Sequence, residues 1–218
     1  YSYIASGLAD VVLVSGAERY DSPGQILEWD NSRGEFKHPI FWASIFTKAY
    51  KREFSITDED LAIVPVKNHK QSQNNPNALS EKTYSLNDVI HSKKLTDDLR
   101  LLDCSRPCTG GASILLASET SCKKFTDTPI WITAIGQKTT SAGFTKNMTF
   151  STMESTSIAT STALKMSNHN IKDIDVAEVH DAFSVCEPMA LESIGFTDKG
   201  TGINMIKELH TTNNFKIN

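Results

Sequence analysis

The chain has 218 residues and a formal net charge of −4, so no excess of basic residues points to a nucleic-acid partner. Hydrophobic residues make up 39% and charged residues 22% of the sequence, a balance typical of a globular protein with a core of its own. Because no apolar run approaches the roughly 18 residues that a membrane span requires, we do not expect an integral membrane protein.

The first residues, YSYIASG, have the pattern of a helix end that is closed by Gly7. The apolar run DVVLVSGAERY follows at residues 10–20 and predicts a strand near 11–15 that helices cover on both faces. The last residues, HTTNNFKIN, stop without a terminating element. A start inside a helix and an open end together lead us to expect the middle of a longer protein.

Residues 21–39 are rich in turn-forming residues and are expected to be irregular. The segment FWASIFTKAYKREF, residues 41–54, has apolar residues at helical spacing and predicts a helix. A second helix is expected from Thr57, because the acidic residues of TDED complement the dipole of a first turn. This helix is expected to be interrupted at Pro65 and to end in the turn NNPNA.

The next part of the chain predicts a short helix around SLNDVIHS and then alternating strands and helices. Strands are predicted at 113–118, after the glycine turn of PCTGGASILLAS, and at 130–136. The Ser/Thr-rich segment that follows carries apolar residues on one helical face and predicts a helix from about 152 to 167. A further strand is expected at 175–179.

The segment DVAEVHDAFSVCEPMALESIGF reads as this strand, a polar turn and an amphipathic helix. SVCE matches a capping box near Ser184, Pro188 fits only a first turn, and Gly195 ends the helix. His180 and Asp181 lie in the turn between strand and helix. In open α/β sheets, ligands bind at this end of a strand, so the position suggests chemistry.

The predicted elements give an α/β fold class. Residues 22–100 separate the first strand from the second, and this stretch is too long for a plain crossover. Insertions of that length usually form a binding subdomain or a lid.

Several stretches of the chain, in order, resemble the thiolases. YIASGLADVVLVSGAERY resembles the helix end and strand that follow the family's nucleophilic cysteine, and VKNHKQSQNNPNAL with LRLLDCSRPCTGGASILLASE resembles the loop-domain motif and the return strand. VAEVHDAFSVCEPMALESIGFTDKGTG resembles the segment that carries an Asn-Glu-Ala-Phe motif in many thiolases. In the sterol-carrier-protein-type and archaeal branches that motif begins His-Asp, as it does here.

The resemblance implies a thiolase-like layered α-β-α-β-α fold, here incomplete at both ends, built from two similar halves and a loop domain that binds coenzyme A. Residues 1–21 and 101–124 would be parts of the N-terminal half, residues 22–100 the loop domain, and residues 125–218 the start of the C-terminal half. Thiolases make or break a carbon–carbon bond between acyl units. The implied substrate is an acyl-CoA thioester, with no further cofactor and no metal.

The resemblance also implies roles for four residues. His180 would help hold the thioester oxygen, or the water beside it, as negative charge develops. Asp181 would orient the loop or cap nearby amides, which makes both residues candidate catalytic groups. Phe183 would pack toward the acyl pocket, and Ser105 would lie near the pantetheine arm of coenzyme A. The alternative for His180 and Asp181 is that they are ordinary loop residues whose side chains hydrogen-bond to the backbone. The alternative for Ser105 is a turn serine without a role in binding.

The sequence departs from the family pattern just after Ser105. Thr109 stands in CTGGAS where many relatives have an aspartate, which puts the local loop contacts in doubt.

The four cysteines do not offer a clear reactive site. Cys186, in the first turn of a helix, could be a stabilised thiolate, but it does not match the reactive cysteine of the family, and its apolar neighbours favour packing. Cys104 and Cys108 lack a second pair at zinc spacing, so no metal site is expected. Four cysteines are too few for a disulfide scaffold, and a cytoplasmic location is expected.

Two motifs that the chemistry requires are absent from the 218 residues. By resemblance, the nucleophilic cysteine is expected before Tyr1 and the activating histidine, in a Gly-His-Pro motif, beyond Asn218. The leading hypothesis is an acyl-CoA C-acyltransferase of lipid metabolism, assembled as a homodimer or tetramer. The alternative is a non-catalytic thiolase-like subunit that binds acyl-CoA or a partner enzyme. A serine hydrolase would need a G-x-S-x-G motif, which the sequence lacks.

Overall fold

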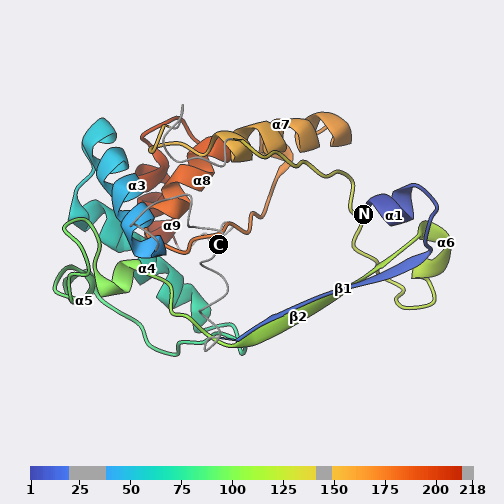
Figure 1. The fold of residues 1–218 in the computed structure, drawn as a ribbon, viewed down its shortest axis with the longest axis horizontal. Coiled ribbons are helices and arrows are strands. Elements are labelled where there is room, and N and C mark those ends of the chain that lie inside the picture. Colours follow the sequence, from blue (N-terminus) through green and yellow to red (C-terminus); the bar gives the residue numbers. More distant parts are fainter. Residues whose placement is uncertain (20–37, 141–148, 213–218) are drawn as a thin grey trace. The chain divides into compact units, whose positions relative to one another are not determined.

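The computed structural model describes residues 1–19, 38–140 and 149–212 (Figure 1). The chain divides into two compact units, one formed by Tyr1–Ile26 and Pro107–Thr133, the other by Leu27–Arg106 and Ala134–Asn218. Within the described ranges, no helix combines the length and the apolar character needed to cross a membrane. The boundaries expected for the two thiolase halves and the loop domain stay predictions.

The first unit contains a two-stranded antiparallel sheet. Strand β1, Val11–Glu18, pairs with β2, Gly110–Ala117. The short helices α1, Ser2–Ala5, and α6, Glu119–Cys122, flank these strands in the sequence. Gly7 has a φ of 75°, a left-handed conformation that glycine adopts without strain, so the predicted helix stop is confirmed.

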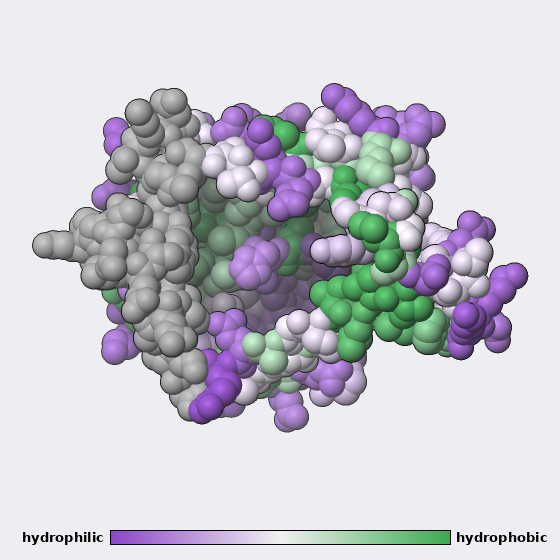
Figure 2. All heavy atoms as spheres, turned by 45° about the vertical axis from the view of Figure 1, so that its right-hand side comes forward, coloured by the Kyte–Doolittle hydropathy of each residue, from purple (hydrophilic) through white to green (hydrophobic). Residues whose placement is uncertain are grey.

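The expectation that β1 is covered on both faces is wrong for the described structure. Leu13 in β1 is 65% exposed and Ile114 in β2 is 57% exposed. Among the described residues the sheet has only these two strands, and the apolar side chains on them stay largely uncovered. Figure 2 shows hydrophobic residues, in green, at the surface of the face that it draws.

Two other predicted strands, at 130–136 and 175–179, are also wrong. The first has no strand conformation, and the second holds a single bridging residue, Ala177. Both were predicted from apolar runs, but a strand also requires a neighbouring backbone to complete its hydrogen bonds. Among the described residues, no strand pairs with either segment.

The second unit is helical, and a core of aliphatic and aromatic residues holds it together. Tyr50, Val64, Leu191 and Ile206 are among its most buried members. The unit contains α3 (Pro39–Phe54), α4 (Asp58–Ser72), α5 (Leu86–Ile90), η2 (Leu101–Asp103), α7 (Glu154–Ser167), η3 (Ile171–Asp173), α8 (Cys186–Ile194) and α9 (Gly202–Thr212). The helices expected near 41–54, at SLNDVIHS and at 152–167 are therefore confirmed, whereas α9 was not predicted. The prediction for 21–39 lies almost wholly outside the described residues.

Helix α4 begins as predicted but is not interrupted. The Thr57 hydroxyl accepts a hydrogen bond from the Asp60 N–H at 3.1 Å, and the Asp60 carboxylate accepts one from the Thr57 N–H at 2.9 Å. The helix then continues through Pro65 to Ser72, so the expected break is wrong. Pro65 and the turn before it are buried in the core, and this packing offsets the hydrogen bond that proline removes.

Helix α8 ends as predicted but begins differently. Gly195 has a φ of 97° and terminates it, and Pro188 lies in its first turn. The predicted capping box at Ser184 is wrong, because the residue before the helix is Val185 and its side chain makes no cap. The Ser184 hydroxyl instead donates to Asp103 Oδ1 at 2.9 Å. The Ser184 hydroxyl therefore takes part in a tertiary contact with Asp103 and does not cap the helix.

Candidate functional site

Two segments that are distant in the sequence pair in the second unit and define the candidate site. The Ser105 N–H donates to the Ala182 carbonyl at 2.9 Å, and the Ser184 N–H donates to the Asp103 carbonyl at 2.8 Å. A single antiparallel β-bridge lies between these two hydrogen bonds. The pairing brings the loop of Ser105 beside the turn that begins at His180.

The four candidate residues differ in exposure. His180 and Ser105 are exposed, while Asp181 and Phe183 are partly buried. Phe183 forms the β-bridge with Cys104 and packs against the core, which anchors the end of the turn. His180 therefore lies at the exposed end of a turn whose other end is fixed.

Asp181 is held by a residue that the sequence did not single out. Asn68 Nδ2, on α4, donates to Asp181 Oδ2 at 2.5 Å and to Glu187 Oε2 at 3.0 Å. Glu187 belongs to the first turn of α8 and is fully buried. One amide group thus joins α4, the turn and α8. The sequence VKNH, residues 66–69, indicates only the resemblance to thiolases. Nothing in this local pattern identifies a partner for Asn68 that lies more than 100 positions away.

A buried ion pair lies beside this amide. Lys67 Nζ is 2.9 Å from Glu187 Oε1, and both side chains are 0% exposed. Lys67 also donates to Gln71 Oε1 at 3.2 Å. Burial raises the pKa of Glu187 above its ordinary value. The positive charge of Lys67 opposes this rise, and so do the hydrogen bonds that Lys67 and Asn68 donate to the carboxylate. The pair matters to stability because removing one buried partner leaves the other uncompensated.

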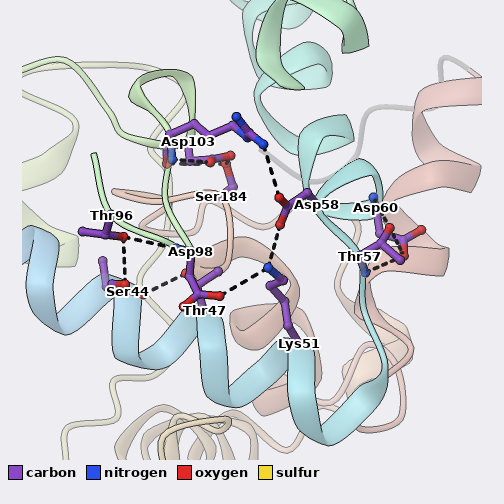
Figure 3. A network of polar contacts seen from close by, with 12 residues as sticks. Ser44, Thr47, Lys51, Thr57, Asp58, Asp60, Thr96, Asp98, Asp103 and Ser184 are labelled. Atoms are coloured by element: carbon purple, nitrogen blue, oxygen red, sulfur yellow. Dashed lines mark hydrogen bonds and ion pairs between the residues drawn. The ribbon is translucent and has the colours of Figure 1, made fainter. Parts of the chain in front are cut away.

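A second polar network fixes the other side of the paired segments (Figure 3). The Asp103 carboxylate accepts hydrogen bonds from the Ser184 hydroxyl at 2.9 Å and from the Arg100 N–H at 2.8 Å. Burial raises the pKa of Asp103, although both hydrogen bonds oppose the rise. Asp58 in α4 accepts from Lys51 Nζ at 2.6 Å and from Arg100 Nη2 at 3.5 Å. The network therefore connects α3 and α4 to the residue that precedes Val185 and α8.

Neither Cys104 nor Cys186 is activated as a nucleophile. Burial raises the pKa of the Cys104 thiol to about 11, and the charge of Asp103 adds to the effect. Burial also raises the pKa of Cys186. Both thiols are therefore protonated near neutral pH, and the early hypothesis of a Cys186 thiolate finds no support. The described residues contain no group of histidine, cysteine and acidic side chains that could hold a metal ion.

The comparisons with known proteins agree with one another. Residues 136–217 match the family model described as "Thiolase C-terminal domain-like". An acetyl-CoA acetyltransferase of Methanothermobacter thermautotrophicus is 32% identical over 91% of this chain and 54% of its own length. The chain thus spans about half the length of the curated acetyl-CoA acetyltransferases it matches.

Solved structures show the same fold. The structure titled "Ltp2-ChsH2(DUF35) aldolase" is similar with a TM-score of 0.85 and 23% identity, covering 100% of this chain and 60% of the other. A monomeric SCP2-thiolase like protein type 1 from Mycobacterium smegmatis gives a TM-score of 0.67 and 16% identity over 96% of this chain and 52% of its own. The fold is therefore thiolase-like, in agreement with the α/β class predicted from the sequence.

Proposed function

Because the chain belongs to the thiolase superfamily, with the sterol-carrier-protein-type motif HDAF, we propose that the protein is an acyl-CoA C-acyltransferase. The observation that carries the proposal is the hydrogen bond between Ser105 and Ala182. It joins the serine assigned to the pantetheine arm of coenzyme A to the turn assigned to the thioester oxygen. We therefore assign Ser105 and His180 to one substrate, which would contact the serine with its pantetheine arm and the histidine with its thioester.

In the proposed reaction, a cysteine thiolate attacks the thioester carbonyl carbon and coenzyme A leaves as its thiolate. The carbonyl oxygen carries negative charge until the leaving group departs, and a fixed donor stabilises that charge most. We assign this donor to His180, and we assign Asp181 to holding the turn. Phe183 closes the site toward the core. In the condensing direction a base removes a proton from the α-carbon of a second acyl-CoA, and the resulting carbanion takes the acyl group from the cysteine. In the cleavage direction the thiolate instead attacks the ketone carbon of a 3-ketoacyl-CoA, the shortened acyl-CoA leaves as a carbanion that is protonated, and coenzyme A then takes the acyl group.

The proposal takes the nucleophile from outside the 218 residues. Burial keeps the thiols of Cys104 and Cys186 protonated, and Cys122 is buried as well. The sequence also lacks the Gly-His-Pro motif that carries the activating histidine in thiolases. Both groups are proposed to lie in the rest of the protein, and a cytoplasmic location is part of the same proposal.

Mass spectrometry tests the proposal. The full-length protein and the isolated chain of residues 1–218 are incubated with acetyl-CoA or acetoacetyl-CoA, quenched and weighed. The expected result is a stoichiometric acyl adduct on the full-length protein only. An adduct on Cys186, or on another cysteine of the isolated chain, would show that the nucleophile is assigned wrongly.

The second candidate function is a thiolase-like subunit that acts with a partner enzyme. The similarity to an aldolase complex favours it, since the match covers 100% of this chain with a TM-score of 0.85. In that case the full-length protein, purified alone, forms no acyl adduct. Native mass spectrometry of the protein from its own cells would then show a hetero-oligomer, whereas the acyltransferase proposal expects copies of one chain.

A further inference from the structure

We propose that Asn68 is a positioning residue, which fixes the His180–Asp181 turn by donating both hydrogens of one amide group to two carboxylates. The inference deepens the proposed function and rests on it, since turnover is one of its readouts. Asn68 lies on α4, in the part of the chain expected to form the loop domain. It would therefore link the loop-domain side of the site to the turn that holds the reacting carbonyl.

The geometry matches the donor capacity of an asparagine side chain. Its Nδ2 has two hydrogens, and it lies 2.5 Å from Asp181 Oδ2 and 3.0 Å from Glu187 Oε2. The two carboxylates fix the orientation of the amide, because a flipped side chain would turn its carbonyl oxygen toward both negative charges. The Asn68 Oδ1 atom is buried and makes no hydrogen bond among the described residues. The amide is thus committed to its donor role.

Charge explains why a neutral donor suits this position. Asp181 and Glu187 are close enough for the charge of Asp181 to add to the raised pKa of Glu187. Lys67, at the neighbouring position of α4, already pairs with Glu187 at 2.9 Å. An asparagine at 68 donates to one oxygen of each carboxylate without adding a further charge to the site. An apolar residue there would leave Asp181 without this hydrogen bond.

The consequence falls on His180. Within the described residues, no hydrogen bond holds its side chain, so the direction of the ring depends on the backbone of the turn. Two interactions restrain that backbone close to the histidine: the Asn68 contact with Asp181 and the hydrogen bond from Ser105 to Ala182. When the first is lost, the donor moves relative to the thioester oxygen, and a displacement of about 1 Å costs about 10²-fold in rate.

The test uses the full-length protein with Asn68→Ala, and with Asn74→Ala as the matched control. Asn74 follows the end of α4 and is exposed. Asn68→Ala should lower kcat by roughly 10–100-fold with little change in KM, because the donor acts on transition-state charge. Asn74→Ala should leave both constants unchanged. Asn68→Ser has a single donor and cannot serve both carboxylates, so it provides the same test if the alanine variant does not fold.

A double-mutant cycle separates positioning from a general loss of structure. If Asn68 acts through Asp181, then Asn68→Ala in an Asp181→Ala background should lower kcat no further. Hydrogen exchange gives a readout that does not depend on activity: Asn68→Ala should speed exchange of the backbone at residues 180–185, while β1 and β2 are unaffected. The inference is overturned if the two substitutions lower kcat independently, so that their factors multiply in the double variant. It is also overturned if Asn68→Ala leaves backbone hydrogen exchange at residues 180–185 unchanged. If the wild-type protein transfers no acyl group, the proposed function fails, and the exchange measurement alone decides the role of Asn68.

Discussion

The His180 side chain is exposed, while Ala182, two positions further on, is held by a backbone hydrogen bond from Ser105. A donor on an anchored turn needs little reorganisation when charge develops on a substrate oxygen. We therefore expect His180→Ala in the full-length protein to lower kcat by roughly 10²–10³-fold, with a much smaller change in acyl-CoA affinity. Steady-state kinetics measure both constants. His169→Ala, at an exposed histidine after α7, is the control; a His180 variant that keeps half its activity would contradict the assignment.

A single carboxylate, Asp58, is expected to contribute to the pH dependence of stability. Burial alone would raise its pKa, but the hydrogen bond and charge of Lys51, together with Arg100, outweigh burial and lower it below the ordinary value of 3.8. The folded state therefore gains stability from the ionised group above this value and loses it as the pH falls through the lowered pKa. Urea unfolding of wild type and Asp58→Asn at neutral and acidic pH measures the effect.

The expected outcome for Asp58→Asn is a smaller free energy of unfolding at neutral pH and a weaker loss of stability on acidification. Asp88→Asn on α5 is a useful comparison, because Asp88 has a lowered pKa from its hydrogen bonds to Ser85 alone and no ion pair is involved. Equal acid sensitivity of wild type and Asp58→Asn would show that the Lys51 contact does not stabilise the fold.

Between elements, α4 and α8 are joined by the fully buried pair of Lys67 and Glu187. Lys67→Met should lower the free energy of unfolding by about 3–5 kcal/mol, since it leaves an uncompensated carboxylate in the interior. Adding Glu187→Gln should recover most of this loss, because the glutamine keeps an acceptor for Asn68 without a charge. Chemical denaturation of the single and double variants measures the difference. A double variant that is less stable than Lys67→Met would contradict this account of the pair.

Local signals in the sequence predicted the helices well, and contacts between distant residues explain what they missed. The cap at Thr57 was predictable, because its partner Asp60 lies three residues away. The start of α8 was not, because the Ser184 hydroxyl bonds to Asp103, 81 positions away. Asn68 was missed for the same reason. Apolar runs likewise suggest strands at 130–136 and 175–179, but only a neighbouring strand could complete their hydrogen bonds.

The family motifs selected four candidate residues, and three of them, Ser105, Asp181 and Phe183, lie in one region of the second unit. They did so from resemblance, since no spacing rule connects HDAF to a serine far earlier in the chain. His180 adjoins this region through Asp181. The roles of all four residues stay predictions, because the backbone pairing brings Ser105 beside the HDAF turn without testing what either binds.

For the whole molecule, the apolar side chains of β1 and β2 need a cover, which either the rest of the full-length protein or a second copy can supply, and we predict that a second copy takes part. Side chains such as Leu13, 65% exposed, lie on strands that no further layer covers in the described structure. We expect the full-length protein to form at least a dimer at micromolar concentration, through an isologous contact that includes β1. Light scattering measures the mass. Leu13→Lys should shift the equilibrium toward monomer, and Leu86→Lys on α5 should not; a monomeric wild-type protein would contradict the prediction.

The hydrogen bonds that build the site also set the order in which the chain can fold. They join residues 77 to 119 positions apart, whereas the cap of α4 spans three. Closing long loops costs entropy before the contacts that reward it exist, so non-local pairings form slowly. During synthesis, the residues of α3, α4 and α5 leave the ribosome before those of the HDAF turn. The site is therefore among the last features to assemble, and a chain stalled before the HDAF turn would lack both the turn and the core residues that α8 and α9 supply.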